Sequence, residues 1–223
     1  MPPLTGCYLF ALGFSSGVAL LTMSAFRRIT PRWLKWGLLA SGALIISRYA
    51  AMAMFATAVQ PQAVWGWRFC WFATSLAIPV QTAFALDQLV RHPAMTPKRV
   101  LLWLSPWLAT YLAVILFGRV VAAPDRIAGW SLHLTPGWQR LLAGAHGAFV
   151  LAVLAFAWRL VPRLPSTAVR LALLGLAAAQ VALAADGVLV GLGHWYVRPY
   201  LWSELLALGA VWHAFETAAR APF

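Results

Sequence analysis

Seven long apolar runs divide this sequence, and no other feature constrains its fold as strongly. Each run has roughly 20 residues, the length that an α-helix needs to cross the hydrocarbon core of a bilayer. Lipid offers no hydrogen-bond partners, so such a chain crosses a membrane as complete helices. The sequence therefore predicts an all-α integral membrane protein, a single domain over residues 1–223 with seven transmembrane helices at approximately 5–26, 34–58, 67–90, 100–121, 138–160, 168–192 and 199–219.

Composition agrees with a membrane setting. Hydrophobic residues make up 62% of the chain and charged residues 10%, whereas a soluble domain has about 25% charged residues. The net charge of +12 would favour a nucleic-acid partner in a soluble protein. Here most basic residues lie in short loops between apolar runs, where membrane topology explains them. We therefore expect the lipid bilayer as a partner and no nucleic acid.

The loop charges also predict the orientation of the chain. The connections after the first, third and fifth runs are the most basic, as in "FRRITPRWLK", and such loops stay in the cytoplasm. We expect the N-terminus outside, the C-terminus in the cytoplasm, and a bacterial inner (plasma) membrane as the location. The longest outer connection, residues 122–137, shows no convincing periodicity and is expected to fold over the outer mouth of the bundle.

A few ionisable residues interrupt the apolar runs. At about 1.5 Å per residue, Arg48 lies roughly 15 Å below the outer end of its helix, His146 about 12 Å, Asp186 about 9 Å and Glu204 about 7 Å. Such groups normally face protein or water. We expect Arg48 to pair with Asp186 or Glu204, which leaves the other carboxylate or His146 free. The candidate ligand-binding residues are Arg48, His146, Asp186, Glu204, Trp67 and Trp202, the two tryptophans belonging to an outer belt with Trp65, Arg68, Trp138 and Trp195.

Three interpretations of this polar group remain open. It forms an ion pair that only fixes helix packing, or the floor of a pocket that opens outward, or its members point apart. Helices that are apolar all round do not reveal their rotation, so periodicity does not choose between them. Elsewhere, Pro79 and Gln81 are expected to kink the third helix and to supply a hydrogen bond. The small residues of "GLAAAQVALAADG" favour close helix packing.

The sequence contains no recognisable catalytic motif. It lacks G-x-S-x-G, H-E-x-x-H and Walker patterns, and Cys7 and Cys70 have no metal-ligand spacing. His146 and His213 could each ligate a haem iron, but their depths place them near opposite membrane faces. We therefore expect a protein that is not an enzyme and that binds no metal, haem or other cofactor.

A first resemblance concerns the third and seventh predicted helices. "WRFCWFATS" (Trp67 to Ser75) is similar to part of the third-helix pattern of microbial rhodopsins at Trp71, Thr74 and Ser75. However, aligning Glu204 with the helix-seven aspartate of that family places Leu208 at the retinal lysine. The only lysines are Lys35 and Lys98, so a retinal Schiff base is excluded.

The order of features resembles the seven-helix N-terminal sensor region of some bacterial histidine kinases. The shared pattern consists of a basic first loop, "WRFCWFATSLAIPVQTAFAL" with its proline, a long outer loop and a basic "WRLVPRLPSTAVR". This resemblance implies a sensor or ligand-receiving module. The kinase part of that family is missing from this sequence, so signalling would need either a longer chain or a partner protein.

The leading hypothesis is a receptor or sensor that binds a small apolar or amphipathic ligand in the outer half of the bundle. Binding would shift the sixth and seventh helices and be read on the cytoplasmic side. The variant Glu204→Gln is expected to alter binding and to leave the folded yield intact. A proton-coupled small-molecule transporter and an accessory subunit of a larger membrane complex are the alternatives.

Overall fold

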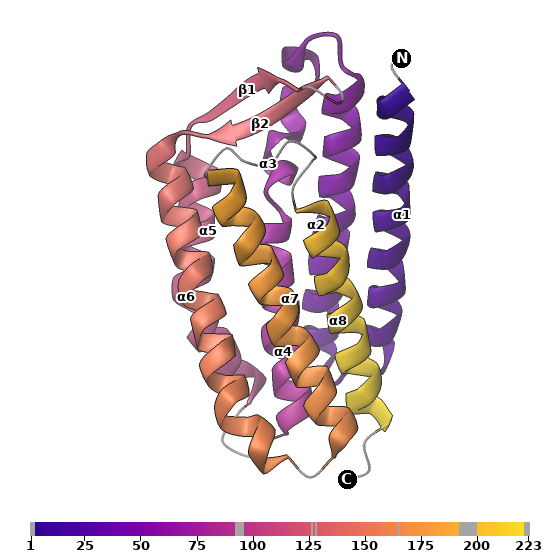
Figure 1. The fold of residues 1–223 in the computed structure, drawn as a ribbon, viewed down its shortest axis with the longest axis vertical. Helices are drawn as coiled ribbons and strands as arrows, with labels where there is room; N and C mark the ends of the chain where they lie inside the picture. Colours follow the sequence, from indigo (N-terminus) through magenta and orange to yellow (C-terminus); the bar gives the residue numbers. More distant parts are fainter. Residues whose placement is uncertain are drawn as a thin grey trace.

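Seven long helices form a bundle in the computed structural model, which describes residues 3–91, 96–125, 127, 129–164, 166–191 and 200–220. The two chain ends lie at opposite ends of the bundle (Figure 1). Each long helix contains most of one predicted run, so the all-α bundle is confirmed. Within the described ranges these helices are α1 (Pro3–Ala25), α2 (Arg32–Thr57), α4 (Thr74–Val90), α5 (Pro97–Phe117), α6 (Pro136–Leu160), α7 (Thr167–Gly191) and α8 (Leu201–Arg220).

The third predicted helix is interrupted near its N-terminal end, which the sequence analysis did not anticipate. It consists of the 3-10 helix η2 (Pro61–Trp67), the single turn α3 (Arg68–Trp71) and then α4. At the junction, the Ala73 and Ser75 amides bond to carbonyls three residues back, at Cys70 and Phe72. This tighter pattern turns the chain between α3 and α4 and leaves the Trp71 carbonyl available to another helix.

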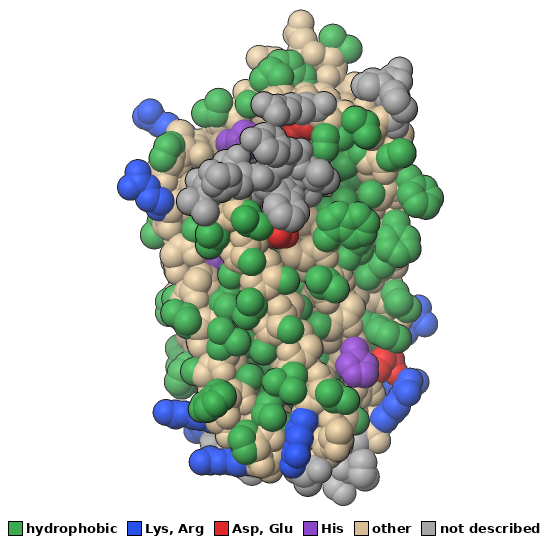
Figure 2. Space-filling model, viewed as in Figure 1, with side chains coloured by type: hydrophobic (Ala, Val, Ile, Leu, Met, Phe, Trp, Pro, Cys, Tyr) green, Lys and Arg blue, Asp and Glu red, His purple; other side chains and the backbone are tan. Residues whose placement is uncertain are grey.

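Six of the helical segments in the described chain are long and apolar enough to cross a membrane. Their outer surfaces carry large exposed hydrophobic side chains, among them Trp103 and Trp158, each 84% exposed. Figure 2 shows a hydrophobic middle band, with Lys and Arg side chains toward the ends of the same face. The seventh helix, α8, packs against α7, α1 and α4 but is less apolar, because it carries Glu204, Glu216 and Arg220.

The long connection between α5 and α6 folds into a β-hairpin. Strands β1 (Val120–Pro124) and β2 (Trp130–Leu134) pair antiparallel, with Val120 opposite Leu134 and Pro124 opposite Trp130. The hairpin lies across the end of the bundle (Figure 1), and Leu132 packs into the apolar core below it. The segment thus folds over one end of the bundle, as expected, and the two strands within it were not predicted.

The turn of this hairpin is fixed on the C-terminal end of α2. Gly129 adopts a φ of +53°, which side-chain-bearing residues rarely take. A Cβ atom at this position would lie 2.4 Å from the carbonyl oxygen of Phe55 and 2.5 Å from that of Ala56. Only glycine allows so close an approach, so the backbone of the hairpin rests directly on the last turn of α2.

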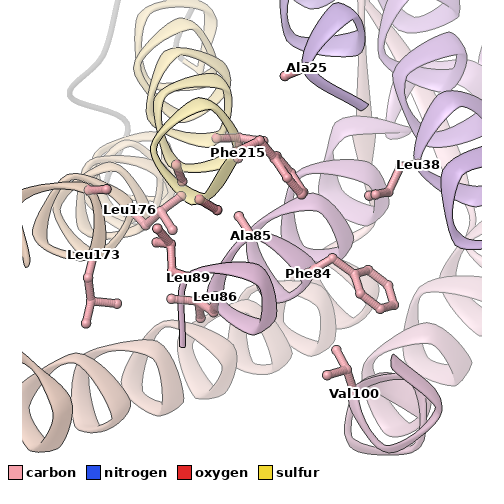
Figure 3. Close-up of a cluster of buried hydrophobic side chains, with 14 of the residues drawn as sticks. Ala25, Leu38, Phe84, Ala85, Leu86, Leu89, Val100, Leu173, Leu176 and Phe215 are labelled. Carbon is pink, nitrogen blue, oxygen red and sulfur yellow. The ribbon is translucent and has the colours of Figure 1, made fainter. Parts of the chain in front are cut away.

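Two buried apolar clusters hold the bundle together. The inner cluster is centred on α4 and includes residues from every long helix. The outer cluster lies beneath the hairpin and includes Tyr49, Phe55 and Ile78. Figure 3 shows how side chains of the inner cluster converge from several helices, with labels on Ala25, Leu38, Phe84, Ala85, Leu86, Leu89, Val100, Leu173, Leu176 and Phe215.

Buried amides link the helices at mid-bundle. Gln81 of α4 donates to the Ser41 hydroxyl of α2 over 3.0 Å, and Gln180 of α7 donates to the Thr82 hydroxyl of α4 over 2.9 Å. Both glutamines are fully buried. The hydrogen bond expected for Gln81 is thus confirmed, and side-chain bonds of this kind join neighbouring membrane helices.

Candidate functional site

A buried ion pair lies at the centre of the half of the bundle nearest the hairpin. Arg48 of α2 and Glu204 of α8 meet with 2.9 Å between Nη2 and Oε1, and their side chains are only 8% and 2% exposed. The Thr74 hydroxyl donates to the same Glu204 oxygen over 2.8 Å, and Arg48 Nη1 donates to the Trp71 carbonyl. The structure therefore selects Glu204 from the two carboxylates predicted as partners of Arg48.

The break between α3 and α4 makes this arrangement possible. An uninterrupted helix would use the Trp71 carbonyl in its own hydrogen-bond ladder, whereas here that oxygen accepts from Arg48. The first residue of α4, Thr74, then reaches Glu204. A charge buried away from water is stable only when its partner and additional hydrogen bonds replace hydration. The pair thus ties α2, the α3–α4 junction and α8 together.

Part of the polar group is not satisfied by hydrogen bonds. Glu204 Oε2, Arg48 Nε and the Tyr49 hydroxyl are buried, and none has a hydrogen-bond partner among the described residues. The Tyr49 hydroxyl lies near the Glu204 carboxylate, but outside hydrogen-bond geometry. Most buried polar atoms in proteins are bonded, so three unpaired atoms in one cluster mark a place where a small change of position or a bound molecule can add bonds.

A cavity of about 400 Å³ lies between this ion pair and the hairpin. That volume is within the usual range for small-molecule sites, roughly 300–1,000 Å³. Arg48, Thr74 and Glu204 contribute its polar floor. The apolar walls come from several helices and the roof from β2, with Met52, Trp71, Ile78, Trp107, Leu142 and Leu183 in the walls and Ser131, Leu132, His133 and Leu134 in the roof.

His146 and Trp107 meet on one wall of the cavity. Their ring centroids, on α6 and α5, are 5.8 Å apart at an interplanar angle of 55°, and both residues line the cavity. The indole nitrogen of Trp107 is buried and has no acceptor in the part of the chain that the structure describes. This wall therefore offers an unused hydrogen-bond donor beside an imidazole.

Three predicted site residues lie elsewhere. Asp186 does not line the cavity; its Oδ2 accepts from the Tyr200 amide over 3.1 Å and from the Ser203 hydroxyl. Asp186 thus caps the start of α8, a structural role that the sequence analysis did not assign. Trp67 and Trp202 are 39% and 61% exposed and do not line the cavity. Trp195, expected in the same belt, lies outside the described residues.

The structure adds residues that sequence reasoning missed. Trp107, Tyr49 and the Trp71 carbonyl belong to the site, and the roof residues of β2 close it. Trp107 carried no usable signal, because one tryptophan in an apolar run is as typical of a lipid-facing helix as of a buried one. Thr74 stood within the quoted "WRFCWFATS" segment, but nothing there linked it to Glu204.

The fold and the site define an all-α membrane bundle with a hairpin-covered cavity above a buried ion pair. No protein-family model and no curated protein matches the sequence. The function is therefore inferred from the cavity itself.

Proposed function

We propose that the chain is a receptor- or sensor-type membrane module that binds a small amphipathic ligand in the cavity beneath the hairpin. The cavity of about 400 Å³ with apolar walls and a polar floor is the observation that carries this proposal. Pockets of this kind bind small molecules through apolar contact and orient them with a few polar groups. Arg48, Glu204 and His146 are the predicted residues that face such a ligand.

The proposed topology has seven spans in a bacterial inner membrane, with the N-terminus outside and the C-terminus in the cytoplasm. Most arginines and lysines lie at the end of the bundle opposite the hairpin, which is the charge bias of cytoplasmic loops. We include α8 among the spans because it packs along α7, α1 and α4 and its acidic residue Glu204 is buried and paired.

Signal transmission would follow from the helices that the site joins. A ligand shifts a conformational equilibrium only when it binds two states with different affinity. A molecule that touches Glu204 or Arg48 changes the contacts between α2, the α3–α4 junction and α8. We propose that α7 and α8 move relative to the other helices, and that a cytoplasmic or membrane partner protein responds to this movement.

The test compares two histidine variants after gentle purification. Native mass spectrometry of the wild-type protein should detect a discrete organic molecule at one copy per chain. The His146→Leu variant should lose it, because His146 lines the cavity. The control His213→Leu should retain it, because His213 is exposed on α8 and does not line the cavity.

Four results would contradict the receptor proposal. A protein that carries no discrete molecule, or equal loss in both variants, would argue against the cavity as a binding site. Net flux of the molecule across proteoliposomes would identify a transporter. Stoichiometric co-purification of a larger membrane complex, without any ligand, would favour an accessory subunit.

A further inference from the structure

The exposure of the cavity-lining residues shows where the cavity opens. Its lining residues on α2, α5 and α8 are buried. Of those on α6 and α7 only Leu183 is buried: Ala143 and Val188 are exposed, and Gly147, Ala184 and Gly187 are partly exposed. The cavity therefore reaches the outside of the bundle along the α6–α7 boundary, in addition to the edge of the hairpin at His133, which is also exposed.

The residues at this boundary are small. Ala143 and Gly147 lie one helical turn apart on α6, and Ala184 and Gly187 lie close together on α7. A Cβ atom at Gly147 would meet nothing within 4 Å, so the space beside it is open. In membrane bundles small residues usually let helices pack closely. Here they leave a gap instead, because the cavity occupies the space between the two helices.

The depth of the gap places it at the level of lipid. Ala143 and Gly147 lie about 10 and 17 Å along α6 from its first residue, at 1.5 Å per residue. Ala184 lies about 10 Å before the end of α7 on the same measure. Large hydrophobic side chains are exposed beside the gap, with Leu151 on α6 at 68% and Val188 on α7 at 61%. Figure 2 shows hydrophobic side chains spread over the middle of this face.

The polar groups of the cavity restrict the charge of its occupant. The guanidinium of Arg48 is already engaged by Glu204 and the Trp71 carbonyl, so the ion pair in the floor carries no net charge. Asp125, which also lines the cavity, lies in the hairpin turn rather than in the floor. A charged group brought there from water would lose hydration without gaining an opposite charge. Trp107 is only 6% exposed. Its indole nitrogen has no hydrogen-bond acceptor within the described chain. A neutral oxygen, as in a hydroxyl or carbonyl group, matches this donor.

We propose that the ligand is a neutral, oxygen-bearing amphiphile that enters the cavity sideways from the outer leaflet, through the gap between α6 and α7. This inference rests on the proposed function, since it names the ligand class and the route for the same cavity. The apolar part of the molecule lies against the cavity walls, and its oxygen accepts from Trp107.

The experiment uses photolabelling of the full chain in liposomes. The probe is a long-chain alcohol that carries a diazirine, and its counterpart is the carboxylate of the same chain length. Labelled peptides are mapped by mass spectrometry over time, with the unlabelled alcohol as competitor. We expect saturable labelling of α5 and α6 peptides around Trp107 and His146 by the alcohol, and little by the carboxylate.

Two glycine variants test the route. Gly147→Phe places a large side chain in the gap, whereas Gly144→Phe places the same group on the exposed side of α6, where a Cβ also meets nothing within 4 Å and no cavity lining is affected. In Gly147→Phe the initial rate of cavity labelling should fall several-fold while the final extent is largely retained. Gly144→Phe should behave like the wild type. If Gly147→Phe does not fold, Ala184→Phe obstructs the gap from α7 instead, and it should lower the initial labelling rate in the same way.

Each result has a defined meaning. Equal rates in the two glycine variants, or an equal loss of rate and final extent in Gly147→Phe, would overturn sideways entry while the cavity remains a binding site. Preferential labelling by the carboxylate would overturn the neutral-ligand assignment alone. Absence of saturable cavity labelling by either probe would overturn the proposed function together with this inference.

Discussion

At the scale of single residues, the Arg48–Glu204 ion pair determines how strongly a substitution at either position destabilises the protein. Both charges are buried, and they share the hydrogen bonds of Thr74 and the Trp71 carbonyl. Removing one partner of such a pair leaves the other charge uncompensated, at a cost of about 3–5 kcal/mol. This geometry changes the earlier expectation that Glu204→Gln leaves the folded yield intact.

We predict that Glu204→Gln lowers the free energy of unfolding by about 3 kcal/mol or more, because Arg48 keeps its charge without a counter-ion. Urea or SDS titration of the purified protein measures this change. The double variant Arg48→Met/Glu204→Gln should regain much of the loss, since it removes the unpaired charge. Equal stability of Glu204→Gln and the wild type would mean that the pair is not formed in the membrane.

The residue scale also shows how far sequence reasoning reached. Arg48, Glu204 and His146 were predictable, because an ionisable group in an apolar run must face protein or water. The choice of Glu204 over Asp186 was not, because it depends on the rotation of α7 and α8 about their axes. Trp107 and the Trp71 carbonyl were also unpredictable. Trp107 is largely apolar, like its neighbours in the run. The Trp71 carbonyl becomes available only because the helix is interrupted after α3.

At the scale of single elements, α8 depends on α7 for the stability of its first turn. Asp186 of α7 accepts from the Tyr200 amide and the Ser203 hydroxyl, which satisfies a free donor of the helix start and places a carboxylate at its positive end. The sequence predicted the small-residue segment of α7. It did not predict this cap, because the cap depends on how α7 packs against the start of α8.

We predict that Asp186→Ala destabilises the protein by about 1 kcal/mol, the usual cost of losing a helix cap. Hydrogen exchange of the amides at 200–204 should become faster in this variant. Ser203→Ala is the matched control, since it removes one of the two contacts and should have a smaller effect. Unchanged exchange in Asp186→Ala would exclude the capping role.

The hairpin is the second element with a defined mechanical role. Its roof residues close the cavity, and Gly129 holds its turn against the α2 carbonyls of Phe55 and Ala56. An L-residue in a left-handed conformation costs roughly 1–2 kcal/mol, and the Cβ contact with these carbonyls adds to this cost.

We therefore predict that Gly129→Ala displaces the hairpin without unfolding the bundle. Limited proteolysis should cut residues 120–134 faster in this variant, and any cavity ligand should dissociate faster. Gly137→Ala serves as the control, because a Cβ there meets nothing within 4 Å and its φ is ordinary. Equal proteolysis of the two variants would show that the turn does not depend on glycine at position 129.

At the scale of the whole molecule, the number and length of the helices could be predicted, and their lateral arrangement could not. Length and hydrophobicity alone define membrane helices, and the seven runs became seven helices in the described chain. Which faces meet is decided by individual contacts such as Gln81–Ser41 and Gln180–Thr82. The hairpin, in turn, is stabilised by its strand pairing and by the bundle beneath it, rather than by a repeating sequence pattern.

The topology itself gives the last prediction. Val59, 91% exposed in the connection after α2, lies at the hairpin end of the bundle, whereas Arg163, exposed in the 3-10 helix η3 (Val161–Arg163), lies at the basic end. In a chain whose Cys7 and Cys70 are replaced by alanine, we expect a membrane-impermeant maleimide to label Val59→Cys in intact cells. Arg163→Cys should react only after the membrane is opened.

The two positions belong to opposite ends of one bundle, so the reagent cannot reach both from one side if the helices span the bilayer. Labelling of both in intact cells would show that the bundle does not cross the membrane as proposed. Labelling of Arg163→Cys alone would reverse the orientation, and the cavity would then open toward the cytoplasmic leaflet. The orientation therefore decides which leaflet supplies the proposed ligand. Because basic loops stay in the cytoplasm, the basic end of the bundle should be cytoplasmic, and the cavity at the opposite end should face the outer leaflet.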